Sequence, residues 1–398
     1  MKFGVFLGPE HKPSNNPTWD LDRDLEFVEH LDKIGFDEAF IGEHHSSGWE
    51  IISSPELFIA AAAQRTKNIK LGTGVISLPY HHPLMVAERI TLLDHLTHGR
   101  LIVGVGPGAL PSDAAMMGLD YTSLRERMEE SLEAILALFT EEGLIDRKTD
   151  WFELNQAQLQ MLPYTRPHPE IAVTAVISPA GANLAGRYGL PMLALAAATP
   201  AGQKVLASHW NMYSEQLARH GKAEPDRKDW RLVSCIHIAP TREEAERQVA
   251  YGIDHAARYA LRDASFLQAV LDTSGLPADA PWLDIFRASE LGVVGTPEDA
   301  IEHIERMQEI SGGYGTHLIR VLDWANPRDT FDSYELFARE VAPHFQDSSR
   351  RRVENWTTFS GSENEFQKAL TAANERARNR YEAERSADAA RGGAGAAK

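Results

Sequence analysis

Short apolar runs alternate along the chain with longer segments in which apolar residues recur at the spacing of a helix. In residues 20–35, Leu21, Leu25 and Val28 fall on one helical face, and Gly35 stands where a helix usually ends. The pattern predicts strands at 2–7, 37–42, 69–76, 100–106, 170–177, 191–196, 230–239 and 316–323. It predicts helices at 20–35, 54–66, 82–99, 123–140, 179–189, 201–220, from Thr241 onward, 295–310 and 332–345.

This alternation indicates a parallel sheet, because parallel strands need a crossover connection that is usually a helix. About eight such units favour a closed (β/α)8 TIM barrel over an open sheet. No Gly-x-Gly-x-x-Gly pattern follows the first strand, which argues against a Rossmann domain. We expect the barrel to span 1–345 and a C-terminal extension to span 346–398, partly helical and disordered over its last ten residues.

Two stretches interrupt the alternation, at residues 106–122 and 259–292. Both are longer than ordinary connections in a compact domain, and long connections are often functional. We expect 259–292 to form a lid over a binding site at one end of the barrel.

Composition narrows the choice of partners and compartment. With 398 residues and a formal net charge of −17, the chain is not expected to bind nucleic acid or an anionic membrane. Its single cysteine, Cys235, excludes an intrachain disulfide and a thiolate metal cluster, and the apolar run around it predicts a buried structural thiol. The sequence shows no signal peptide and no run of about 18 apolar residues, so the reducing cytoplasm is the expected location.

Glu43, His44 and His45 directly follow the second predicted strand, in the sequence "IGEHH". In a parallel barrel the chemistry gathers at the carboxyl ends of the strands, where these side chains would lie. They could bind a metal, carry out acid–base chemistry or only form hydrogen bonds that hold a loop in place. Adjacent histidines point in different directions and the other strand ends offer few further ligands, so no metal site is predicted. An acid–base role and a purely structural role for His44 both remain open on this evidence.

The segment "ISPAGANLAG" follows the fifth predicted strand. Ser178 is expected at the N-cap of the next helix and Pro179 at its first position, with small residues Ala180 and Gly181 after them. The free amides of such a helix start form an anion site that suits a phosphorylated cofactor. A well-capped helix without a ligand is the alternative.

Several segments in the same order resemble the bacterial luciferase-like family of flavin-dependent monooxygenases. They are "MKFGVFL", "GFDEAFIGEHH", "IKLGTGVISLPYHHP", "LLDHLTHGR", "RYGLPM", "GTPEDAIEHI" and "REVAPHF", and the likeness covers most of 1–345. The resemblance implies a barrel that binds reduced FMN (FMNH2) at the strand carboxyl ends. It also implies that the flavin reacts with O2 to give a C4a-peroxyflavin.

The resemblance also implies roles for individual residues. His44 matches the histidine that acts as catalytic acid or base in the luciferases. A non-proline cis peptide beneath the flavin ring is expected at Gly74–Val75, and Gly106 is expected to face the ring. Ser178, Ala180 and Gly181 are expected at the phosphate.

Three positions depart from the luciferase pattern. Gly106 replaces a reactive cysteine, Pro107 replaces a phosphate-binding arginine, and Ile177 replaces a glutamate. These departures are closer to the terpene- and heterocycle-oxidising branches of the family than to luciferase itself.

The substrate side of the site is expected to be apolar, because water and stray protons destroy an activated flavin. Leu193 and Leu195 are expected in its wall. Trp49 and Trp324 are further candidates, with plain packing as their alternative.

The resemblance predicts a two-component monooxygenase that receives its reduced FMN from a separate NAD(P)H:flavin reductase. The substrate would be a small, largely apolar or heterocyclic organic compound. A homodimer is expected through the second and third helices, where "FIAAAAQR" carries small side chains. The alternatives are a deazaflavin (F420)-dependent reductase or dehydrogenase on the same barrel, and a non-catalytic flavin-binding barrel.

Overall fold

The computed structural model describes residues 1–8, 10–46, 48–260, 264–360 and 365–393. The chain forms two compact units, Met1–Ala342 and Pro343–Lys398. None of the described helices is both long enough and apolar enough to cross a membrane.

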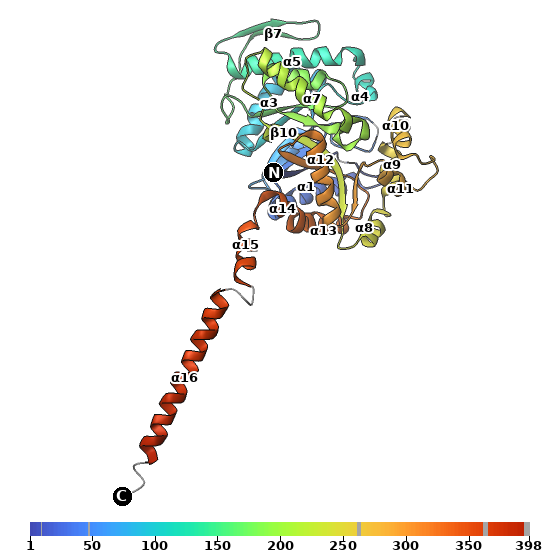
Figure 1. The fold of residues 1–398 in the computed structure, drawn as a ribbon. Coiled ribbons are helices and arrows are strands. Elements are labelled where there is room, and N and C mark those ends of the chain that lie inside the picture. Colours follow the sequence, from blue (N-terminus) through green and yellow to red (C-terminus); the bar gives the residue numbers. More distant parts are fainter. Residues whose placement is uncertain (9, 47, 261–263, 361–364, 394–398) are drawn as a thin grey trace. The chain divides into compact units, whose positions relative to one another are not determined.

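The first unit is a closed barrel of eight parallel strands surrounded by helices (Figure 1). Each strand pairs with its neighbours in chain order, and the last strand pairs with the first, Lys2 opposite Thr316. The strands are β1 (Lys2–Leu7), β2 (Glu38–Ile41), β3 (Lys70–Thr73), β5 (Leu101–Gly106), β8 (Glu170–Ala175), β9 (Met192–Ala194), β10 (Trp230–Ile238) and β12 (Thr316–Val321). The predicted (β/α)8 barrel is confirmed, and all eight predicted strand regions supply a barrel strand.

The main helices follow the strands as predicted, most of them with small shifts at their ends. They are α1 (Pro17–Ile34), α2 (Pro55–Ala63), α3 (Pro83–Thr97), α5 (Leu124–Thr140), α6 (Ala180–Tyr188), α7 (Pro200–Arg219), α8 (Arg242–Val249), α12 (Pro297–Ser311) and α13 (Pro327–Leu336). The helix predicted at 332–345 begins at Pro327 and is divided by a π-helix at Phe337–Val341, and the helix predicted from Thr241 ends at Val249. Helix α1 begins before the predicted residue 20, because the Asn16 side chain accepts a hydrogen bond from the Thr18 amide and caps it there.

Apolar side chains from several strands meet inside the barrel and fill it. The cluster consists of Phe40, Ile102, Ala172, Leu193, Val233 and Leu318, all buried. Leu193 was predicted for the substrate wall and instead lies fully buried in this cluster. The inward-facing residues of barrel strands form packed layers, and Leu193 is the middle residue of the three-residue strand β9.

The structure contains strands that the pattern missed. The antiparallel hairpin of β6 (Ile145–Lys148) and β7 (Glu153–Ala157) was missed because its residues are mostly polar. Strand β11 (Gly292–Gly295) is short and pairs in parallel with the end of β10. The predicted third strand is divided into β3 and β4 (Ile76–Ser77) at Gly74–Val75.

Both interrupting stretches contain helices. Residues 106–122 include α4 (Pro111–Met116). The predicted lid, 259–292, includes the end of α9 (Ile253–Ala260), α10 (Ala264–Ser274) and α11 (Trp282–Ala288). Residues 261–263 of the predicted lid lie outside the described residues.

The second unit is helical. It contains α15 (Arg350–Phe359) and α16 (Glu365–Gly393), and α14 (Ala342–Gln346) begins at the boundary between the units. Disorder was predicted for the last ten residues, but residues 389–393 continue α16. Ala389 and Ala390 favour this continuation, because alanine has the highest helix propensity, and the helix ends at the glycines Gly392 and Gly393. Residues 394–398 lie outside the described part of the chain.

Candidate active site

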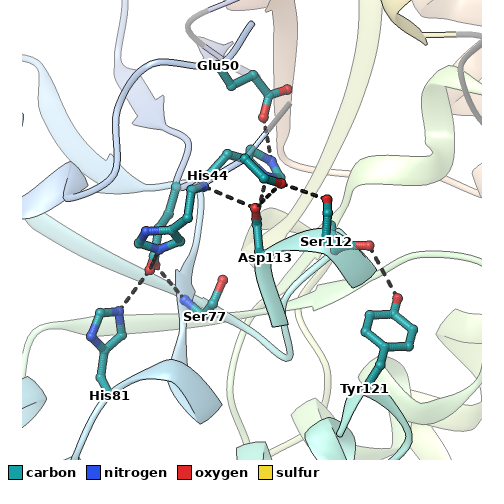
Figure 2. A network of polar contacts seen from close by, with 11 residues as sticks. His44, Glu50, Ser77, His81, Ser112, Asp113 and Tyr121 are labelled. Atoms are coloured by element: carbon teal, nitrogen blue, oxygen red, sulfur yellow. Dashed lines mark hydrogen bonds and ion pairs between the residues drawn. The ribbon is translucent and has the colours of Figure 1, made fainter. Parts of the chain in front are cut away.

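His44 lies between two carboxylates in the loop after β2 (Figure 2). Its Nδ1 is 3.2 Å from Asp113 Oδ2, and its Nε2 is 2.5 Å from Glu50 Oε2. The His44 amide donates to the Ile52 carbonyl, which fixes the backbone of the loop. The imidazole side chain is 17% exposed, so it is held firmly while one edge stays open to solvent or a ligand.

Asp113 joins this loop to α4, which follows β5. It is buried, and it accepts hydrogen bonds from the His45 amide and the Ser46 hydroxyl as well as from His44. Burial alone would raise the pKa of Asp113, but the hydrogen bonds from His44 and Ser46 hold it below its usual value. Asp113 is therefore a carboxylate at neutral pH and can orient the imidazole.

Glu43 points to the opposite side of the loop and ties it to the segment after β3. Its carboxylate accepts from His45 Nε2 (2.9 Å), His81 Nε2 (2.8 Å) and the Ser77 amide (2.7 Å). Burial would raise the pKa of Glu43, but the hydrogen bonds from His45 and His81 lower it. The hydrogen bond to Glu43 in turn raises the pKa of His45. This network holds the loop that carries His44.

The ends of β3 and β5 approach each other closely beside this loop. The peptide bond Gly74–Val75 is cis, as the resemblance predicted. A Cβ atom on Gly106 would lie 2.7 Å from Val75 Cγ2 and 3.1 Å from Thr174 Oγ1. A side chain at Gly106 would therefore collide with its neighbours, and the surface here is formed by Val75 and backbone.

A pocket of about 400 Å³ lies beyond Thr174, between the start of α6 and the start of α5. Ser178, Ala180 and Gly181 line it together, as the sequence predicted. A Cβ atom on Gly181 would lie 2.0 Å from the Thr174 carbonyl oxygen, so glycine allows α6 to begin directly against the end of β8.

The predicted N-cap at Ser178 is wrong by one residue. Helix α6 begins at Ala180 and Pro179 occupies the cap position without a side-chain hydrogen bond. The reason is that the Pro179 carbonyl accepts the first helical bond, from the Asn183 amide. Ser178 thus lies one residue before the cap, exposed and on the rim of the pocket.

Two arginines line the same pocket and were missed from the sequence. Arg125 is exposed near the start of α5, and Arg187 forms an ion pair with Glu129. The carboxylates of Glu126 and Glu129 line the pocket too, and Arg187 is paired with Glu129, so Arg125 is the arginine that we take as the candidate phosphate ligand. The sequence "SLRER" directly after the interrupting stretch 106–122 was the available signal for Arg125.

These features fit a phosphorylated flavin. An anionic phosphate suits the helix start and Arg125, because helix amides and arginine both bind phosphate well. At Gly106, the side chains of Val75 and Thr174 fill the space that a Cβ atom would occupy, so a ring placed here would contact Val75 and backbone. Among the described residues there is no group of three or more histidine, cysteine, aspartate or glutamate side chains that could hold a metal ion.

The remaining predicted pocket residues lie toward α9 and α11. Trp49 stacks on Tyr259, with ring centroids 5.2 Å apart. Leu195 and Trp324 line a separate apolar pocket, and Cys235 lines it too. Cys235 is buried as predicted, and burial raises the pKa of its thiol to about 11.

Residues 1–312 match the sequence model of a family described as luciferase-like monooxygenase. This chain belongs to that family. It is 43% identical over 385 residues to limonene 1,2-monooxygenase of Rhodococcus erythropolis, and the match covers 97% of each chain. It is also 43% identical over 350 residues to 4-hydroxyprotoasukamycin monooxygenase of Streptomyces nodosus subsp. asukaensis, covering 87% of this chain and 93% of that one.

The barrel is also similar to a solved flavin enzyme. This is the oxygenating constituent of 3,6-diketocamphane monooxygenase from Pseudomonas putida, a type II Baeyer–Villiger monooxygenase in complex with FMN. The TM-score is 0.75 at 29% identity, and the match covers 86% of this chain and 98% of that one. Together these findings confirm the predicted family and the class of enzyme, a flavin-dependent monooxygenase.

Proposed function

We propose that this luciferase-like monooxygenase uses reduced FMN and O2 to transfer one oxygen atom to a small, largely apolar or heterocyclic organic compound. The observation that carries the proposal is the position of His44. It is held between Asp113 and Glu50 at the same end of the barrel as the cis peptide Gly74–Val75.

The chain's own residues would hold the flavin at two places. Arg125, Ser178 and the amides at Ala180 and Gly181 would bind its phosphate, and Val75 and Gly106 would support its ring. When bound, reduced FMN supplies the electrons that activate O2. His44 manages the proton in this account, because an imidazole can both accept and donate one near neutral pH.

Asp113 and Glu50 keep the His44 ring in one orientation. Each ring nitrogen faces a carboxylate: Nδ1 is hydrogen-bonded to Asp113, and Nε2 lies at ion-pair distance from Glu50. Ring rotation would break both contacts at once. A fixed ring shortens the search for a reactive arrangement, which is a main source of enzymatic rate enhancement.

A separate NAD(P)H:flavin reductase would supply the reduced FMN. The support is that the similar diketocamphane enzyme is named as an oxygenating constituent. The absence of a nicotinamide-binding fingerprint in this sequence agrees with a separate reductase.

A homodimer through α2 and α3 is part of the proposal. Both helices expose large apolar side chains, namely Leu57, Met85, Leu92 and Leu96. Exposed apolar side chains on adjacent helices are typical of an interface. Light scattering tests this, and a monomeric mass would refute it.

Cofactor binding and oxygen incorporation into the product test the central proposal. Anaerobic titration should show that reduced FMN binds more tightly than reduced F420. With a generic flavin reductase, a panel of small apolar compounds and 18O2, one labelled oxygen atom should enter the product. Tighter binding of F420, together with no oxygen incorporation, would instead support the hydride-transfer alternative.

A further inference from the structure

An apolar pocket of about 150 Å³ lies between the carboxyl ends of the strands and the helices α9 to α11. Its walls include Leu195 after β9, Ile253 on α9, Val270 on α10, Phe286 on α11 and Trp324 after β12. The pocket is thus closed on one side by the segment that the sequence predicted as a lid. An enclosed apolar cavity of this volume can hold a molecule the size of benzene, and this pocket has mostly apolar walls with Thr199 and Arg320 among them.

Arg320 is the one charged side chain among the described residues that line this pocket. Its Nε donates to Glu10 Oε1 at 3.1 Å, and its Nη2 contacts the same oxygen more closely. Glu10 is 5% exposed, so the two charges neutralise each other within the wall. A guanidinium has five N–H donors, more than these contacts with Glu10 use.

The ion pair determines which ligand charge the pocket accepts. An anionic ligand would add a second negative charge beside Glu10, and a cationic ligand would meet Arg320. Either would leave one charge in the apolar pocket without a partner, which disfavours binding. A neutral molecule with one acceptor oxygen avoids this cost and can receive a hydrogen bond from Arg320.

The pocket and the proposed flavin site share a packed core. Leu195, which lines the pocket, and Val75 both pack against the same core cluster. Trp49, next to Glu50, stacks on Tyr259 of α9 and so connects the His44 loop with the lid segment. A molecule in the pocket would therefore lie at the same barrel end as His44.

We infer that this pocket binds the organic substrate and selects a neutral, single-ring compound with one carbonyl or hydroxyl oxygen. That the bound molecule is the substrate rests on the proposed function. The apolar walls recognise the ring, and Arg320 orients its oxygen.

Ligand binding to the full-length, flavin-free protein tests the inference without any turnover. Trp282 and Trp324 line the pocket, so their fluorescence reports on its occupancy. Cyclohexanone should bind at least tenfold more tightly than cyclohexanecarboxylate, its anionic counterpart. Ala256→Phe, which fills the pocket from α9, should weaken cyclohexanone binding at least tenfold. The matched control Asp254→Phe puts the same ring on the exposed face of α9 and should leave binding unchanged.

Reduced FMN binding, measured on the same proteins, separates the two proposals. If reduced FMN binds but the Ala256→Phe variant binds cyclohexanone as tightly as the wild-type protein does, the pocket inference is overturned. The proposed function still stands in that case. Equal affinity for the ketone and the carboxylate would also overturn it. If cyclohexanone binds as expected but reduced FMN does not, the proposed function fails and the pocket remains a binding site.

Discussion

The two sides of the barrel end differ in how they are built. Around His44, buried carboxylates and histidines form a network in which nearly every contact is charged. Around Trp324, the walls are apolar and one ion pair, Arg320 with Glu10, lies among them. In the proposed function, the first construction would fix polar groups for proton transfer, and the second would limit the access of water to the substrate.

The largest effect should come from removing the imidazole on the polar side. We expect His44→Ala to lower kcat by about 10²- to 10⁴-fold, the usual contribution of acid–base catalysis. The affinity for reduced FMN should stay unchanged. The control His220→Ala removes an exposed histidine at the end of α7 and should retain full activity. A fully active His44→Ala enzyme would remove the proposed role.

The stability of the folded protein should depend on pH through His11, which follows Glu10 in the loop after β1. Burial lowers the pKa of His11, but the hydrogen bond to Asp24 and the nearby carboxylate of Asp323 outweigh it and raise this pKa from 6.5 to about 9. The stabilisation that protonated His11 gives to the folded protein is therefore complete below pH 6.5 and is lost as the pH rises toward about 9. It amounts to at most about 3 kcal/mol.

Thermal unfolding between pH 6 and pH 9.5 measures this effect. We expect the wild-type Tm to fall across that range relative to His11→Gln, whose side chain does not titrate. Parallel curves for the two proteins would show that His11 does not contribute in this way. Such a result would weaken the view that charged networks hold the loop in place.

A smaller effect should appear at the phosphate pocket. Arg125→Met should weaken the binding of reduced FMN about tenfold or more, because hydrogen bonds to charged groups contribute about 1.5–3 kcal/mol. Riboflavin, which lacks the phosphate, should lose little affinity. The control Arg219→Met changes an exposed arginine on α7 and should bind FMN normally. Equal losses for FMN and riboflavin would contradict a phosphate contact.

The smallest effect should come from Glu50, which acts through His44. Glu50→Gln keeps the shape but removes the negative charge beside His44 Nε2, and we expect kcat to fall about tenfold, because the ion pair that helps to orient the imidazole is lost. The pH dependence of kcat should also change, while the Tm and FMN affinity should not. A lower Tm with an unaltered pH profile would assign Glu50 a purely structural role.

Local sequence patterns were enough to predict the barrel strands and the loop that carries His44. The strands were visible because parallel barrel strands are short apolar runs, and "IGEHH" was placed at a strand end by that pattern. The resemblance to a known family supplied the cis bond at Gly74–Val75 and the role of His44. Both depend on residues that are close together in the sequence.

Partners distant in sequence could not be predicted. Asp113 is 69 residues from His44, and its place depends on how α4 folds back after β5. Arg125 became visible only when the starts of α5 and α6 were seen to face one pocket. Leu193 was misplaced because an apolar residue near a strand end can face either the core or the pocket, and packing decides between them.

The account's central claim is that the polar side of the barrel end holds the flavin beside His44. A crystal structure of the protein with FMN tests this most directly. The account predicts a phosphate within hydrogen-bond distance of Arg125 and the Gly181 amide, and a ring that lies over Val75 and Gly106 with His44 at its edge. A flavin bound elsewhere, or a His44 ring turned away from it, would contradict the account.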